Sequence, residues 1–144
     1  MALRDAIVSL QSKALSLPGI KEAPIDPPES ANQFPFAISY VRAGTWHIES
    51  SGFSHAQVQL VTELHGARTL LPTDIQTMLP FFEQFLRKLL ADQTLGGAVD
   101  NIGNVDFSFG VMEYGVQGGV PIQTIGWQFV LSGPDGAGVK VTIT

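Results

Sequence analysis

The longest run of apolar residues with helical spacing lies between Pro72 and Leu90. A helix with this pattern has one continuous apolar face, which another element must cover. Thr73 and Gln76 match a capping box and predict where the helix starts. Pro80 lacks a backbone donor, so we expect it to kink or split the helix near Leu79. The apolar positions of the predicted face are Ile75, Met78, Leu79, Phe82, Phe85, Leu86 and Leu89.

Alternation of apolar and polar residues from Ser54 to Leu64 predicts a strand with one buried face. The set that contains Val58 and Leu60 is expected to point toward a core. The set that contains Gln57 and Glu63 is expected to point toward water or a polar partner.

Four other segments precede the central helix. Ala2–Leu15 has helical spacing and predicts an amphipathic helix. Ile20–Gln33 contains three prolines and four charged residues, which indicates an extended connector. Phe34–Arg42 predicts a strand that ends at Ala43 and Gly44, and Thr45–Glu49 predicts a second, short strand.

The last third of the chain predicts a hairpin and a tail. Val105–Met112 and Ile125–Leu131 alternate as strands do, and Gly115–Pro121 is expected to be the turn or loop between them. Residues 1–132 then form one domain, and residues 133–144 form a flexible linker with a β-prone tail. That tail could pair with a neighbouring subunit, form an edge strand of its own sheet, or remain a disordered end.

This order of elements predicts an α+β fold, with an antiparallel sheet and both helices packed on one face. The strands outnumber the helices and are joined mostly by hairpin-type turns. The pairs expected to cover the central helix are Val58 with Leu60, Phe107 with Phe109, and Trp127 with Phe129.

The amino-acid composition indicates that the surface carries few charged side chains. Charged residues make up 15% of the 144 residues, against roughly 25% in soluble domains. Either much of the surface is buried against other subunits, or the surface is neutral and rich in Gln, Ser, Thr and Gly. The net charge of −5 argues against a groove that neutralises nucleic-acid phosphates.

Several signals of compartment are missing from the sequence. There is no cysteine, which excludes disulfides, thiolate nucleophiles and cysteine-based zinc sites. The first ten residues do not match a signal peptide, and no apolar run approaches the ~20 residues of a membrane span. We therefore expect no membrane association and a cytoplasm-like compartment.

The residues that could carry chemistry do not form a recognisable motif. His47, His55 and His65 could in principle hold zinc, but no HxH or HxxxH pattern accompanies them, which favours surface or interface histidines. The carboxylates lack the spacing of an acid/base pair, and no serine lies in a GxSxG motif. We expect no enzyme, no metal and no cofactor, and instead a small oligomeric structural protein.

The order of features also resembles a known family over nearly the whole chain. The first helix ends in Leu17–Ile20, and a proline-rich connector leads to the strand Phe34–Arg42. The central helix ends in Leu89–Asp92 and is followed by Leu95–Val99, and the closing hairpin ends in Ile125–Phe129. This layout resembles the tail terminator, or tail completion, proteins of long-tailed phages, which include the lambda-type and SPP1-type tail-to-head joining proteins.

The resemblance implies a homohexameric ring at the head-proximal end of the tail, assembled in the host cytoplasm. Such a ring would bind the last ring of the tail tube protein, stop its polymerisation and present a surface to the head-completion or connector proteins. Genomic DNA would pass through it without sequence-specific binding, and six copies at −5 each would carry −30. The family pattern contains no catalytic residues.

Two other functions are alternatives to a tail terminator. One is another neck or head-tail completion protein, and the other is a small ligand-binding or enzymatic α+β domain.

Three segments are candidates for contacts with partners: Ala43–Ser54, Gly115–Pro121 and Gly133–Thr144. Each could instead be an ordinary solvated segment. Phe81 lies off the main apolar stripe of the central helix and is the residue of that helix expected to contact a neighbouring subunit. The complete set of candidate interface residues is Trp46, His47, Phe53, Phe81, Val116, Gln117, Val139, Val141 and Ile143.

Overall fold

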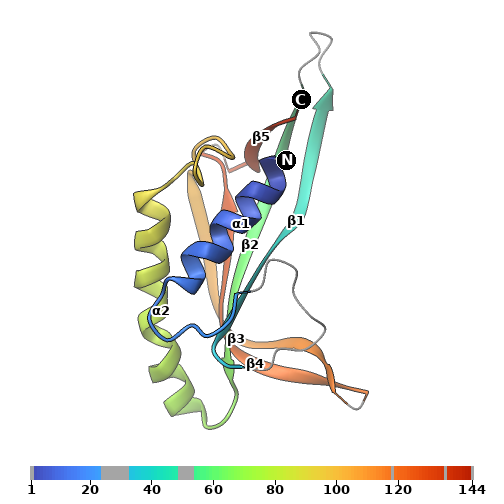
Figure 1. Ribbon diagram of the computed structural model, residues 1–144. Coiled ribbons are helices and arrows are strands. Elements are labelled where there is room, and N and C mark those ends of the chain that lie inside the picture. The colour runs from blue at the N-terminus through green and yellow to red at the C-terminus, as the bar shows by residue number, and fades with distance from the viewer. Residues whose placement is uncertain (1, 24–32, 49–53, 118, 135, 144) are drawn as a thin grey trace.

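An antiparallel sheet of five strands carries both helices on one of its faces (Figure 1), which confirms the predicted α+β class. The computed structural model describes residues 2–23, 33–48, 54–117, 119–134 and 136–143. The helices are α1 (Ala2–Leu15) and α2 (Leu71–Ala91), and the strands are β1 (Phe36–Ile48), β2 (Ser54–Ala67), β3 (Asn104–Gln117), β4 (Val120–Ser132) and β5 (Val139–Ile143).

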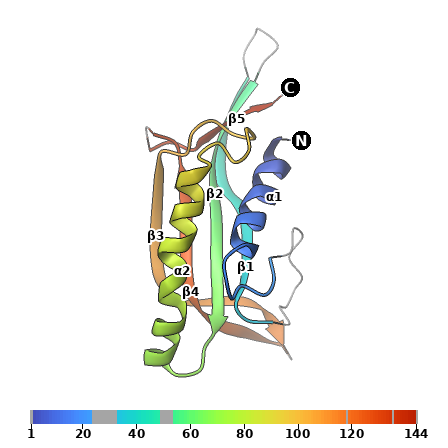
Figure 2. The same cartoon turned by 60° about the vertical axis from the view of Figure 1, so that its left-hand side comes forward.

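Strand β2 lies at the centre of the sheet, whose order is β1-β2-β4-β3. One edge of β2 pairs with β1, and the other pairs with β4 over Leu60–Ala67 and with β5 over Ser54–Val58. β5 therefore continues the line of β4 along the same neighbour. Figure 2 shows α1 over β1 and β2, and α2 beside the outer strand β3.

The C-terminal tail belongs to this sheet, so placing it outside the domain of residues 1–132 was wrong. β5 is an edge strand of its own chain, which is one of the three alternatives, and Val139 and Val141 are 0% and 1% exposed. Both valines were expected at an interface and instead pack in the core of this chain. The reason is that β2 is longer than its overlap with β4, and the tail fills the edge left over.

Helix α2 packs on the sheet through Met78, Phe85 and Leu89 of the predicted stripe, but the buried face is rotated away from Ile75 and Leu79 and toward Phe81. Phe81 is 6% exposed and Leu79 is 56% exposed, although the stripe included Leu79 and left out Phe81. A β-carbon added to Gly19 would lie 3.4 Å from the Phe81 ring, and Trp127 Nε1 donates a hydrogen bond of 2.8 Å to the carbonyl of Met78. These contacts fix the rotation of α2, and Phe81 is a core residue rather than an exposed contact.

Helix α2 also begins differently from the prediction. Leu70 is the N-cap and makes no side-chain capping bond, so the capping box was wrong. Instead, the Asp74 carboxylate accepts hydrogen bonds from the backbone N–H of Thr69 at 2.9 Å and from its hydroxyl at 2.7 Å.

Pro80 does not split α2, which continues to Ala91. It lies on the exposed side of the helix, where water can bond the carbonyl that loses its donor.

Strand β1 continues through the two residues that were expected to end it. A bulge between Val41 and Ala43 shifts the register, and pairing with β2 then resumes as far as Ile48. Gly44 serves close packing rather than a turn, because an added β-carbon would lie 2.6 Å from the carbonyl oxygen of Gln57.

The β3–β4 hairpin is longer than predicted. Val116 pairs with Pro121 and Gln117 pairs with Val120, so the segment expected to be a loop is mostly strand. The register shifts between Glu113 and Val116. We call the far part of this hairpin, 112–117 with 120–124, the hairpin arm. Figure 1 shows it turning away from α2 at the lower end of the sheet.

A buried polar chain attaches α1 to the sheet. Gln11 Nε2 donates to the carbonyl of Ala37 at 3.2 Å, and Gln11 Oε1 accepts from the Ser39 hydroxyl at 2.8 Å. Ser39 and Thr62 share a further bond of 2.9 Å. Each buried group therefore has a partner, which avoids the cost of an unsatisfied polar atom.

The rotation of α2 predicts how two neighbouring positions respond to truncation. We expect Phe81→Ala to lower the free energy of unfolding by about 3–5 kcal/mol because it removes a buried ring. We expect Leu79→Ala to cost less than about 1 kcal/mol because Leu79 is exposed. Urea unfolding followed by tryptophan fluorescence measures both. Equal losses, or a larger loss for Leu79→Ala, would contradict the observed rotation.

Candidate functional site

The main exposed apolar feature combines a line of α2 with the outer strand of the sheet. Leu71, Ile75 and Leu79 are four residues apart on α2, and Phe107 and Val111 share the helix-side face of β3. All five are between 40% and 56% exposed. We call these five residues the α2–β3 surface.

The geometry of the hairpin explains why this surface is uncovered. Phe82 continues the same helical line and contacts Phe107, with ring centroids 4.7 Å apart. Toward the start of α2 the hairpin arm turns away (Figure 1). Ile75 and Leu79, in this part of the helix, are 40% and 56% exposed. Large exposed apolar surfaces of this kind mark interaction sites.

A second feature lies on the opposite face of the sheet, where a buried carboxylate links three strands. Tyr40 Oη and Gln128 Nε2 donate to Glu63 Oε2 at 2.6 and 2.9 Å. His65 Nε2 lies 2.8 Å from Glu63 Oε1, and His65 Nδ1 lies 2.5 Å from Thr124 Oγ1. A carboxylate only accepts, so His65 Nε2 carries a proton, and in the neutral imidazole Nδ1 accepts from the Thr124 hydroxyl.

The ionisation of this network follows from burial and hydrogen bonding. Burial by itself raises the pKa of Glu63, but the hydrogen bonds from His65, Tyr40 and Gln128 outweigh it and hold that pKa below its ordinary value. Burial, followed by the bond to Glu63 and its negative charge, raises the pKa of Tyr40 to about 12. At neutral pH the Glu63 carboxylate is therefore charged, and the Tyr40 hydroxyl that donates to it is neutral.

Thr124, His65 and Glu63 are connected in the order of a catalytic nucleophile, base and acid. Solvent and substrates, however, have no access to Thr124 or His65. Thr124 and His65 are both fully buried, and the His65 ring stacks on Phe36 with centroids 4.9 Å apart. Tyr114 of the hairpin arm packs on the same two rings. A substrate cannot reach the Thr124 hydroxyl, so the arrangement acts as a structural connection between β1, β2 and the hairpin.

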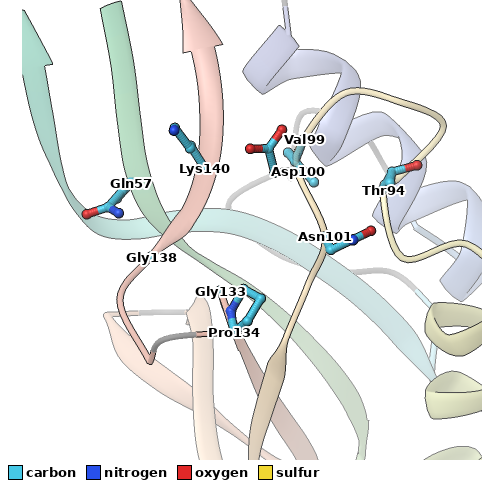
Figure 3. Close-up of a pocket in the computed structure, with 9 residues that line it drawn as sticks. All are labelled: Gln57, Thr94, Val99, Asp100, Asn101, Gly133, Pro134, Gly138 and Lys140. Atoms are coloured by element: carbon cyan, nitrogen blue, oxygen red, sulfur yellow. The ribbon is translucent and has the colours of Figure 1, made fainter.

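A hollow of about 600 Å³ opens beside β5 (Figure 3). Its charged lining residues are Lys140 and Asp100, which lie near each other in Figure 3, and Gln57 and Asn101 contribute amides. The residues that line it include no nucleophile with a neighbouring base. The hollow therefore gives no support for the enzymatic alternative.

The histidines do not assemble into a metal site in the described part of the chain. His47 and His55 are opposite each other in the β1–β2 register, and His65 lies ten residues farther along β2. The described residues contain no group of three or more His, Cys, Asp or Glu side chains placed to hold a metal ion. Neither described helix is both long and apolar enough to cross a membrane.

The predicted interface residues fall into three groups. Trp46 is 58% exposed near the end of β1, as an interface residue requires. Phe81, Val139 and Val141 are core residues, so their prediction as contacts was wrong. Phe53 lies outside the described residues, and for His47, Val116, Gln117 and Ile143 the structure describes the strand but not the side chain.

The sequence prediction missed the α2–β3 surface. One signal was present: apolar residues between positions 71 and 90 are too many for a single helical face, and they include Leu71 and Leu90 beyond the predicted stripe. Which of them face outward depends on the rotation of α2, which is set by distant contacts such as that of Trp127.

No protein-family model matches the sequence, and no curated protein matches it. A functional assignment therefore depends on the surfaces described above and on the resemblance in layout.

The Glu63 network predicts a pH-dependent effect on stability. Because the pKa of Glu63 is lowered in the folded protein, its contribution is present above the unfolded pKa near 4.3 and is lost as pH falls through the folded pKa. We expect Glu63→Gln to lower the free energy of unfolding by about 1–3 kcal/mol at pH 7, since an amide nitrogen replaces one acceptor.

The difference between wild type and Glu63→Gln should shrink below about pH 4. Urea unfolding at several pH values measures it. Glu83→Gln is the matched control, because Glu83 forms an exposed pair with Arg87 that contributes less than about 1 kcal/mol. A constant difference down to pH 2 would show that the carboxylate charge is not what stabilises the network.

Proposed function

We propose that this chain is a structural virion protein, a tail terminator that caps the tail tube of a long-tailed phage, stops its polymerisation and forms the surface for head attachment. The α2–β3 surface is the observation that carries the assembly role, because five large apolar side chains lie exposed beside an open strand. The layout of elements, which resembles the tail terminator proteins, supports this particular assembly.

Two ends of the molecule offer the contacts that the proposal needs. Trp46 is exposed near the end of β1, and the hairpin arm projects at the other end of the sheet (Figure 1). A ring built from such subunits has two different faces, one for the tube and one for the head. Val120 on the arm is also strongly exposed and suits a protein contact.

The charge distribution is compatible with a channel for DNA. The face of the sheet opposite the helices presents Gln57, Gln59, Ser108 and Asp106, and Lys140 lies opposite Gln57 on the same face. The carboxylate of Asp106 offsets the charge of Lys140, and amides and a hydroxyl do not neutralise phosphates, so DNA beside this face would be held weakly. The net charge of −5 per copy favours the same behaviour.

The proposal predicts that Leu79→Glu abolishes capping while leaving the fold intact. Leu79 is exposed, so a charge there costs little in the free subunit but would be buried unpaired in the assembly. The chain is added to polymerising tail tube protein of the same virus, and tubes are examined by negative-stain electron microscopy. Wild type should limit tube length and appear as a ring at one end.

Gln76→Glu is the matched control, since it adds the same charge to an exposed position off the apolar line. It should cap tubes as wild type does. Tubes that grow without limit and carry no ring when wild type is added would overturn the tail terminator proposal. Binding to heads or connectors instead of tube ends would favour another neck protein.

A further inference from the structure

The three open edges of the described sheet differ in how well they are protected against pairing. β5 is only five residues long. β1 has a bulge between Val41 and Ala43, and its start is already bridged by Glu22, whose carbonyl accepts from the N–H of Ala37 at 2.9 Å. Short length, bulges and covering segments are the means by which edge strands avoid further pairing.

β3 has none of these protections over most of its length. From Asn104 to Glu113 it pairs regularly with β4, without a bulge, and contains no proline and no basic residue. Its outer edge has no partner among the described strands. A regular edge of ten residues, with Val105, Phe107, Phe109 and Val111 on its helix-side face, therefore remains available for another strand.

We propose that β3 pairs antiparallel with β3 of a second copy of this chain, about a two-fold axis through Phe109. In this register Phe107 lies opposite Val111 of the partner, so the two exposed apolar side chains of β3 cover each other. Asp106 lies opposite Met112 of the partner, and no like charges face each other. A register centred on Gly110 would instead place Phe107 opposite Glu113.

The antiparallel arrangement also explains the apolar line on α2. Residues opposite each other in a pair of strands share a face of the sheet, so both copies have α2 on the same side of the joined sheet. Ile75 and Leu79 of each copy then flank the junction together with Phe107 and Val111. A parallel pairing would place the two helices on opposite sides and leave both lines exposed.

A two-fold contact closes on itself and cannot propagate around a ring. If the proposed function is correct, the dimer is the resting form of the free protein, and its β3 edge opens when the chain meets a tube. Only this last statement depends on the tail terminator proposal.

The absence of cysteine allows a direct test of the register. Ser108 and Gly110 are expected opposite each other across the junction, and Gly110 has space for an added β-carbon. Single variants Ser108→Cys and Gly110→Cys are purified, mixed and oxidised, and the products are separated on a non-reducing gel. The mixture should form a disulfide-linked dimer, and each variant alone should form at least tenfold less. Equal linking in all three samples would overturn the register.

Sedimentation equilibrium without tail tubes tests the dimer itself. Wild type should have a mass near twice 15.5 kDa, and Phe107→Glu should raise the dissociation constant at least tenfold. Val41→Glu is the matched control on the β1 edge and should leave the dimer unchanged. A wild-type monomer at all concentrations, or a dimer lost only in Val41→Glu, would overturn the proposal.

These measurements separate the dimer from the proposed function. If Phe107→Glu unfolds, the cysteine variants still decide the matter, because they change only small residues at the strand edge. Failure to cap tubes leaves the solution dimer standing, and a monomeric free chain leaves capping untouched.

Discussion

The fold depends on strand β2 being paired on both sides over most of its length. β1 takes one edge, and β4 and β5 share the other. Because Leu60 and Leu64 point to one face and Glu63 and His65 to the other, the pairing of β2 places an apolar core and a polar network back to back. A shift of one residue would exchange these faces, so the register of every other strand follows from this one.

The rotation of α2 decides which apolar residues are left for contacts outside the chain. The hydrogen bond from Trp127 to the Met78 carbonyl and the packing of Phe81 beside Gly19 turn one side of the helix inward. Leu71, Ile75 and Leu79 are thereby directed outward along β3. The core is complete without them, so the presence of large apolar residues at these exposed positions is better explained by a partner than by folding.

The sequence predicts the element types well because the periodicities of α2 and β2 are long and regular. It does not predict how far strands continue, since Gly44 and Gly115 look like turn residues. Pairing with Val58 places Gly44 inside β1, and Gly115 lies in an irregular part of β3 where pairing with β4 resumes at Val116. The place of β5 was equally inaccessible, because nothing local to residues 139–143 says that β2 has an unpaired stretch. The candidate surface requires the rotation of α2, which depends on Trp127, 49 residues away.

Both faces of the sheet are largely occupied, so its outer edges are the places left for contacts between subunits. Of these, the outer edge of β3 is the most suitable. The helix side is filled by α1 and α2, and the centre of the opposite face is closed by Glu63, His65 and the rings around them. The outer edge of β1 is interrupted by its bulge and by the bridge from Glu22. The edge formed by β3 is regular and adjacent to uncovered helix surface, so an association through it buries the exposed apolar side chains of both β3 and α2.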